Sequence, residues 1–344
     1  MSIEIMKLRG DRAQRFLEIR RQHVATQHHK NPNYISLMNE VDMLMGASTL
    51  IYTHREGTEQ AMTDSLVRIQ NFLMNEPDFI SCIDVPKVKN FLSYVIFPEI
   101  QYNTLHLFEI MMSPLNLMCH DVVSDIMRVT RSRSHVSVCE KAVHVLEVMA
   151  ASSPDVRSSL YGKGVMASLC LLVNDCYDDN SKVSVIRSAT SCISSMCHGM
   201  ASANRAYMKD ILGTMSLLLD ERVCDFTVVF NACFVLTQII DGSMHGEIIQ
   251  IMMKLLDKVL CLAYQNCDRN MMMSLLSLFE TITGYINIDR IYIDKLKSIV
   301  TFFFGRCSPC AQHIQEENEN MWIRLVSLEN KLSGNGTISV SNSF

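Results

Sequence analysis

The sequence predicts an all-helical protein built from repeats, and three observations lead to this prediction. First, the good helix formers Leu, Met, Ala and Lys are frequent, whereas only 7 Pro and 13 Gly interrupt the 344 residues. Second, apolar residues recur at helical spacing in several segments. Third, those segments return after roughly 40 to 47 residues, which is the period of HEAT and armadillo repeats. Such repeats bury their apolar faces against one another in an elongated superhelix.

The overall composition argues against several classes of protein. Hydrophobic residues make up 48% of the chain and charged residues 19%, which excludes a mostly disordered chain. The net charge of −5 does not favour nucleic acid as a partner. No apolar run approaches the roughly 18 residues of a membrane span, and the N-terminus has no signal-peptide core. We therefore expect a cytoplasmic and nuclear protein without a membrane partner.

The 13 cysteines predict reduced thiols, because disulfides are rare in these compartments. Cys307 and Cys310 have the spacing of a zinc knuckle, with His313 nearby. A structural zinc site needs four ligands, usually from two such pairs, and the sequence has no second pair. We therefore expect no metal. There is also no phosphate-binding loop, GxSxG turn or HExxH pair, so we expect neither a cofactor nor an enzyme.

Residues 1–40 are expected to form a basic N-terminal arm. Within residues 1–35 the local net charge is +4, because seven basic residues outnumber three acids. The basic residues are Lys7, Arg9, Arg12, Arg15, Arg20, Arg21 and Lys30. No apolar stripe in this stretch is wide enough to fold alone. It is either a solvated tail or a segment that docks on an acidic partner or on the acidic remainder of the chain.

Residues 41–332 are expected to hold about six helical repeats, and residues 333–344 a disordered polar tail. Three segments carry the same apolar stripe at helical spacing. Its members are Ala142, Val145, Leu146 and Met149, then Ala189, Cys192, Ile193 and Met196, then Ala232, Val235, Leu236 and Ile239. The leading alanines are 47 and 43 residues apart. Related segments end at Gly199, Gly242 and Gly284, where glycine can form a left-handed helix cap.

Two of these segments resemble the third helix of an importin-α armadillo repeat. Residues 187–199 read RSATSCISSMCHG, against R-N-A-x-W-x-L-S-N-L-C-R-G in the family. Residues 231–242 read NACFVLTQIIDG, against D-A-C-W-A-L-S-Y-L-S-D-G. Weaker matches lie at 108–112, 140–149, 276–284 and 316–332. The resemblance implies an all-α, right-handed armadillo superhelix with about six repeats instead of the family's ten.

The resemblance also implies a cargo groove whose usual side chains are mostly replaced. In the family, a Trp and an Asn four residues later share one helix face. The indoles make slots for Lys or Arg stems, and the amides hold the peptide backbone. The corresponding positions here are Met112, His144, Ser191 and Phe234 for Trp, and Asn116, Val148, Ser195 and Gln238 for Asn. Only Asn116 is retained, and the sole tryptophan, Trp322, falls in the last partial repeat. A classical nuclear-localisation peptide is therefore expected to bind weakly or not at all.

One repeat is expected to be short, because only 32 residues separate Ile110 from Ala142 where about 40 are usual. Its first helix is expected to be missing or fused, and Pro114 to break or kink the helix before it. Two alternatives also stay open. His144 is either a pH-sensitive groove residue or a hydrogen-bonded or exposed histidine without that role. The 24 methionines either make an adaptable surface or fill a loosely constrained core.

The basic arm resembles the family's importin-β-binding segment in a diluted form. Residues 20–30 read RRQHVATQHHK, but the final basic cluster expected near 36–39 is missing. The resemblance gives Arg20, Arg21 and Lys30 as importin-β-binding candidates. It implies a nuclear import adaptor that binds protein cargo on its concave surface. The alternative is an armadillo interaction scaffold with no transport role.

Overall fold

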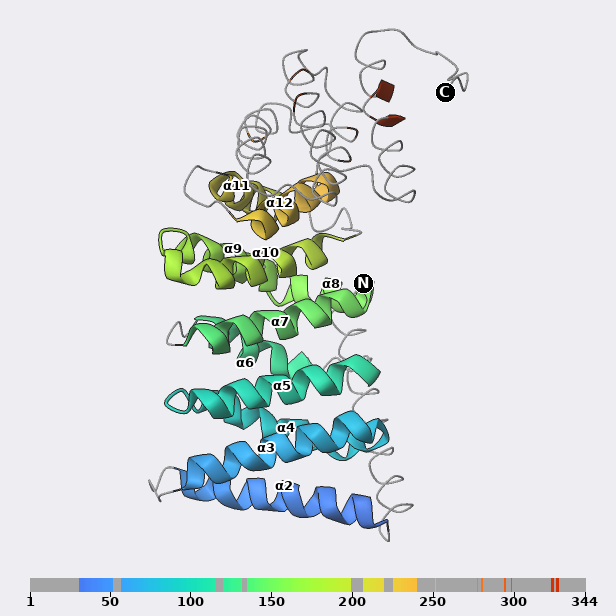
Figure 1. Ribbon diagram of the computed structural model, residues 1–344, viewed down its shortest axis with the longest axis vertical. Coiled ribbons are helices and arrows are strands. Elements are labelled where there is room, and N and C mark those ends of the chain that lie inside the picture. The colour runs from blue at the N-terminus through green and yellow to red at the C-terminus, as the bar shows by residue number, and fades with distance from the viewer. Residues whose placement is uncertain are drawn as a thin grey trace, which may run out of the picture. The chain divides into compact units, whose positions relative to one another are not determined.

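The protein is all-helical wherever its structure is described, which confirms the predicted fold class. The computed structural model describes residues 31–51, 57–115, 120–131, 135–198, 207–219 and 225–239, with single residues at 251, 277, 280, 294, 298, 323, 324, 326 and 327 (Figure 1). These residues form α-helices and short 3-10 helices, without a strand among them. No helix in this part of the chain is long and apolar enough to cross a membrane. The tail at 333–344 and the Cys307–Cys310 pair lie outside the described residues.

The chain forms two compact units, Met1–Ser168 and Leu169–Phe344. The described part of the first unit begins with α2 (Pro32–Leu50), which packs on α3 (Thr58–Asn75). Asn31 starts α2, because its side chain accepts a hydrogen bond from the N–H of Asn33 at 2.9 Å and Pro32 takes the first helical position. Leu37 of α2 is buried. The boundary predicted at residue 40 therefore falls inside α2, and residues 32–40 belong to the first packed helix.

A series of short elements leads to the next long helix of the first unit. These are η2 (Pro77–Cys82), α4 (Val85–Val88) and η3 (Lys89–Ser93). They precede α5 (Pro98–Leu115), which packs on α3 and η3. Pro114 lies in the last turn of α5, and the helix ends one residue later. The break expected at Pro114 is thus the end of α5, since proline cannot donate the hydrogen bond that would extend the helix.

The short repeat consists of two helices, α6 (His120–Arg131) and α7 (Val136–Ser152), which pack on each other. Only residues 116–119 separate α5 from α6, about one helical turn, so this repeat has no separate first helix. The next repeat starts with α8 (Pro154–Gly162), capped by the Ser153 hydroxyl, which accepts from the N–H of Val156 at 3.3 Å. Gly164 adopts a φ of 74° before α9 (Val165–Cys176) begins.

The second unit contains η4 (Asn180–Lys182), α10 (Val183–Cys197), α11 (Met208–Leu218) and α12 (Phe226–Ile239). Helix α12 packs on α10 and α11. Further along, the guanidinium of Arg324 donates to the Glu280 carboxylate at 2.8 and 2.5 Å. That bond raises the pKa of Arg324. The two residues are 44 positions apart, about one repeat, so this contact fits the same periodicity.

Within each unit, the last helices of successive repeats pack on one another. In the first unit α3 packs on α5 and α5 on α7, and Figure 1 shows them as successive layers. In the second unit α10 packs on α12. All twelve residues of the apolar stripe predicted on α7, α10 and α12 are buried, and none is more than 3% exposed. Many of the described methionines are buried in the core, while Met43 and Met74 are more than half exposed. An adaptable methionine surface stays a prediction.

Candidate functional site

Burial defines one solvent-facing stripe on the last helix of each repeat. On α7 the buried pairs Ala142–Val143 and Val145–Leu146 leave His144 exposed between them. The same order of buried residues recurs 47 and 90 positions later on α10 and α12. It places Ser191 and Phe234, both half-buried, at the position equivalent to His144. Residues four positions further, Val148, Ser195 and Gln238, are half-buried on the same face.

The stripe on α5 has a register that differs from the one the sequence resemblance implied. The buried pairs Thr104–Leu105 and Leu107–Phe108 flank His106, so His106, six residues before Met112, is equivalent to His144. Glu109 then corresponds to Glu147, and the same spacing of a histidine and a glutamate three residues later recurs on both helices. The side chain of Met112 and the whole of Asn116 are outside the described residues.

Several other predicted positions also lie outside the described residues. These are Arg20, Arg21 and Lys30 of the arm and Trp322 near the C-terminus. On α12, the described ring of Phe234 stacks with that of His198, with centroids 6.2 Å apart and an interplanar angle of 13°. No cluster of His, Cys, Asp and Glu in the described part of the chain could hold a metal ion.

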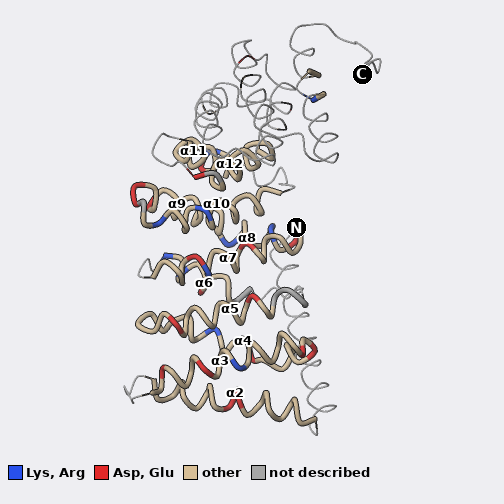
Figure 2. The backbone as a smooth tube through the Cα atoms, in the orientation of Figure 1, with Lys and Arg blue, Asp and Glu red and all other residues tan. Residues whose placement is uncertain are grey.

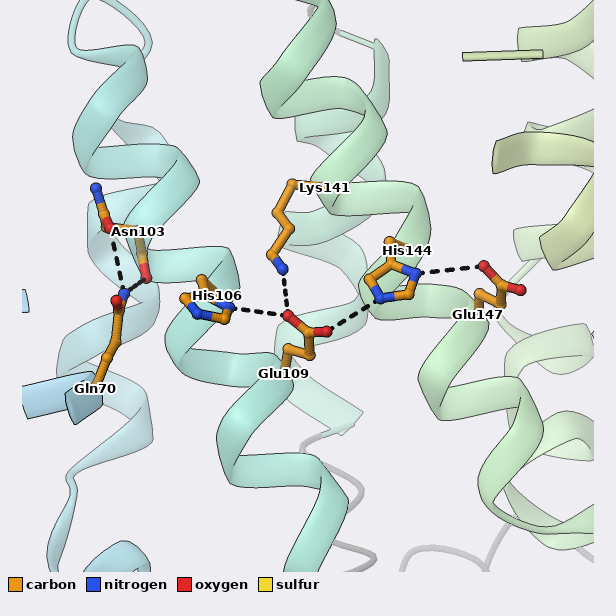
Figure 3. A network of polar contacts seen from close by, with 7 residues as sticks. All are labelled: Gln70, Asn103, His106, Glu109, Lys141, His144 and Glu147. Carbon is orange, nitrogen blue, oxygen red and sulfur yellow. Dashed lines mark hydrogen bonds and ion pairs between the residues drawn. The ribbon is translucent and has the colours of Figure 1, made fainter. Parts of the chain in front are cut away.

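Glu109 of α5 is the centre of a polar network that joins α5 to α7 (Figure 3). Its Oε2 contacts Nδ1 of His106 at 2.9 Å and accepts a hydrogen bond from Nζ of Lys141. Its Oε1 faces His144, whose other ring nitrogen lies 3.4 Å from Oε2 of Glu147. His144 is therefore both exposed and hydrogen-bonded. A role in sensing pH stays a prediction.

The network determines the charge state of Glu109. Burial alone would raise the pKa of this carboxyl group, but the hydrogen bonds from Lys141 and His106 and the charges of Lys141 and His144 outweigh it. The pKa is lowered to about 2, so the group stays ionised at neutral pH.

Lys141 lies between an anion and an aromatic ring. Its side chain is only 12% exposed, although it stands beside the exposed His144. Its ammonium group is 5.8 Å from the centroid of the Tyr102 ring, within the range of a cation–π contact. Tyr102 and Glu109 both belong to α5, so the cation comes from the neighbouring repeat.

Buried amide side chains hold neighbouring stripe helices in register. Between α3 and α5, Nε2 of Gln70 donates to the backbone carbonyl of Asn103 at 2.7 Å (Figure 3). Between α10 and α12, Nδ2 of Asn231 donates to Oγ1 of Thr190 at 3.4 Å. Because a buried amide that loses its partner is costly, these bonds penalise sliding of one repeat on the next.

Comparison with known proteins identifies the architecture. No protein-family model and no curated protein matches the chain. Among solved structures, a designed armadillo repeat protein in complex with the peptide (KR)4 matches with a TM-score of 0.51 and 15% identity, over 71% of this chain and 100% of that one. Designed armadillo repeat proteins for modular peptide recognition match with a TM-score of 0.53 and 15% identity, over 71% and 99%. This chain has an armadillo-like fold.

A third match covers a larger share of the chain. An engineered protein matches with a TM-score of 0.55 and 11% identity, over 92% of this chain and 82% of that one. Identities of this size show the fold alone, so membership of the importin-α family stays a prediction.

The armadillo stripe differs in character between the two units. On α5 and α7 it holds ionisable groups, namely His106, Glu109, Lys141 and His144. On α10 and α12 its residues are mostly uncharged, namely Ser184, Ser188, Ser191, Ser195, Thr227, Phe234 and Gln238. The exposed Arg187 of α10 also lies on this face, and it is paired with Asp225. Figure 2 shows charged residues interspersed along the helices rather than gathered on one element. The stripe is therefore neither the acidic nor the indole-lined surface on which a lysine-rich peptide binds by simple attraction.

Sequence reasoning missed Tyr102, His106, Glu109 and Lys141 as stripe residues. A signal was present, because residues at i and i+3 or i+4 share a helix face, and Tyr102, His106 and Glu109 have that spacing. Their meeting with Lys141 depends on how α5 stacks on α7, which the spacing within one helix does not give.

Proposed function

We propose that this chain is a non-enzymatic armadillo scaffold that binds an extended segment of a partner protein along the exposed stripe of its third helices. The observation that carries the proposal is the equivalence of Asn71, His106, His144, Ser191 and Phe234 in the burial pattern of five helices. Within each unit, solvent-facing side chains that recur from one packed helix to the next suit an extended partner, which offers a backbone group at regular intervals.

The stripe contains the groups that hold a peptide backbone. Gln238 has an amide that both donates and accepts, and Ser191 and Ser195 have hydroxyls with the same ability. Half-buried Phe234 offers apolar contact area. Two of the solved structures that share the fold are named for peptide recognition or for a bound peptide, which supports the same use here.

Selection from a displayed peptide library tests the proposal. Peptides selected on the intact chain are measured by fluorescence anisotropy against Asn71→Glu and Ser191→Glu, one stripe variant in each unit. Ser158→Glu, an exposed position on α8, is the matched control. We expect about tenfold weaker binding in at least one stripe variant and wild-type binding in the control. Recovery of no peptide, or equal binding by all variants, would count against the scaffold.

A nuclear import adaptor that moves between cytoplasm and nucleus is the more specific form of this proposal. It rests on the sequence resemblance and on the +4 charge of residues 1–35. Guanidinium groups pair bidentately with carboxylates, which makes Arg20 and Arg21 the best candidates for importin-β binding. We expect salt-sensitive binding of importin-β that the Arg20→Ala, Arg21→Ala double variant loses. No binding by the intact chain at low salt would leave the scaffold without a transport role.

A further inference from the structure

The contact between Lys141, Glu109 and Tyr102 has the composition of a binding site for a basic side chain. An ammonium group beside a carboxylate and near an aromatic ring gains both charge-assisted hydrogen bonding and a cation–π contribution. Here Nζ of Lys141 donates to the carboxylate of Glu109 and lies 5.8 Å from the centroid of the Tyr102 ring. The protein itself therefore supplies the cation that a peptide lysine would bring.

Access to this site from solvent is limited by the lysine that occupies it. The Lys141 side chain is 12% exposed and that of Glu109 is 23% exposed. Both carboxylate oxygens of Glu109 already have partners, since His106 and Lys141 contact Oε2 and His144 contacts Oε1. An incoming Lys or Arg would first have to displace Lys141 and would gain only the contacts that Lys141 loses.

We propose that Lys141 is a built-in occupant of a cation site formed by Glu109 and Tyr102, and that it restricts the α5–α7 face to partner segments that are uncharged where they cross this site. The inference rests on the proposed function, because it names the partner class of the same stripe. Lys141 acts as a selectivity residue. It blocks a basic side chain by occupying the site, while an uncharged segment leaves the network intact.

Removal of the lysine gives a direct test with the octapeptide (KR)4, labelled with fluorescein, as the probe. We expect Lys141→Ala to bind this peptide about tenfold more tightly than the wild type, the effect of about one charge-assisted hydrogen bond. Lys141→Arg keeps a cation in the site and should bind as weakly as the wild type. Adding Glu109→Gln to Lys141→Ala should remove the gain.

A matched control distinguishes the effect of opening the cation site from the effect of removing one positive charge anywhere on the protein. Lys182→Ala also removes a lysine from an ion pair, since Nζ of Lys182 lies 2.9 Å from Oδ2 of Asp179. We expect this variant to bind (KR)4 as the wild type does. Equal gains in both variants, or a gain in Lys141→Ala that survives Glu109→Gln, would overturn the inference.

Thermal unfolding provides a second measurement in case Lys141→Ala is destabilised. We expect n-butylammonium chloride to raise the Tm of Lys141→Ala toward the wild-type value, beyond the effect of the same concentration of ammonium chloride. The wild type and the Lys141→Ala, Glu109→Gln double variant should show no such difference. Absence of this rescue together with absence of peptide binding would reject the cation site. The scaffold proposal is judged separately, by the library peptides on the wild-type chain.

Discussion

At the residue scale, the partly exposed carboxylate of Glu109 contributes to stability through a network of contacts. A single exposed ion pair typically contributes less than about 1 kcal/mol to stability. Glu109 differs because its side chain is 23% exposed and three donors from two helices surround it. The packing of α5 on α7 is therefore linked to whether the Glu109 carboxyl group is ionised.

Glu109→Gln should change how stability depends on acid. The pKa of Glu109 in the folded protein is about 2, below the ordinary value near 4.3 of the unfolded chain. A depressed folded-state pKa means that the stabilisation is complete above the unfolded pKa and is lost as the pH falls through about 2. Between pH 5 and pH 2 we expect the wild type to lose about 1 to 2 kcal/mol more unfolding free energy than Glu109→Gln. Urea unfolding followed by circular dichroism measures this.

The matched control for this acid dependence is Asp64→Asn, which neutralises an exposed carboxylate on α3 that accepts a hydrogen bond from Gln60. Its acid dependence should follow that of the wild type closely. If Glu109→Gln and Asp64→Asn lose stability in parallel with the wild type, the network does not stabilise the ionised carboxylate.

At the element scale, Asp225 links the start of α12 to α10. Its Oδ1 accepts a hydrogen bond from the N–H of Val228 at 3.1 Å, which caps the helix, while its Oδ2 accepts from Nε of Arg187 at 2.7 Å. The Asp225 side chain is 12% exposed and that of Arg187 is 51% exposed. The cap should therefore contribute more to stability than the ion pair.

Asp225→Ala should lower the free energy of unfolding by about 1 to 2 kcal/mol, because it removes both the cap and the ion pair. Arg187→Ala should cost about 0.5 kcal/mol, since an ion pair with a half-exposed guanidinium is weakened by solvent and Asp225 keeps its hydrogen bond from the N–H of Val228. Chemical denaturation of both variants and of the double variant measures the coupling between them. A larger cost for Arg187→Ala than for Asp225→Ala would contradict this ranking.

At the scale of the whole molecule, the armadillo-like fold and the replaced groove residues determine what the chain can bind. A basic import peptide needs aromatic slots for its stems and acidic groups for its heads. The described stripe has His144, Ser191 and Phe234 at equivalent positions, and its acid Glu109 is already paired. These substitutions remove several contacts at once.

A lysine-rich nuclear-localisation peptide should accordingly bind the intact chain at least about a hundredfold more weakly than it binds an ordinary importin-α. The loss of several hot-spot contacts is the reason. Fluorescence anisotropy at physiological salt compares the two proteins directly. An affinity equal to that of importin-α would show that the groove tolerates these substitutions.

The sequence determined the features of this protein that depend on local periodicity. The apolar stripe at Ala142, Val145, Leu146 and Met149 predicted a buried helix face because residues at these intervals share one side of a helix. The recurrence of the stripe predicted the repeats, and the short interval after Ile110 agrees with the two-helix repeat of α6 and α7. Each of these features is set by spacing along the chain.

Only the tertiary structure decided which residues of α5 are buried and which partners its stripe has. His106 rather than Met112 is equivalent to His144, because buried pairs flank both histidines. Lys141 reaches Glu109 and Tyr102 across that interface, from 32 and 39 positions away in the sequence. Helical periodicity tells which face a residue occupies. The side chain it meets depends on the axial offset between two helices, and that offset is set by the packing of all the residues between them.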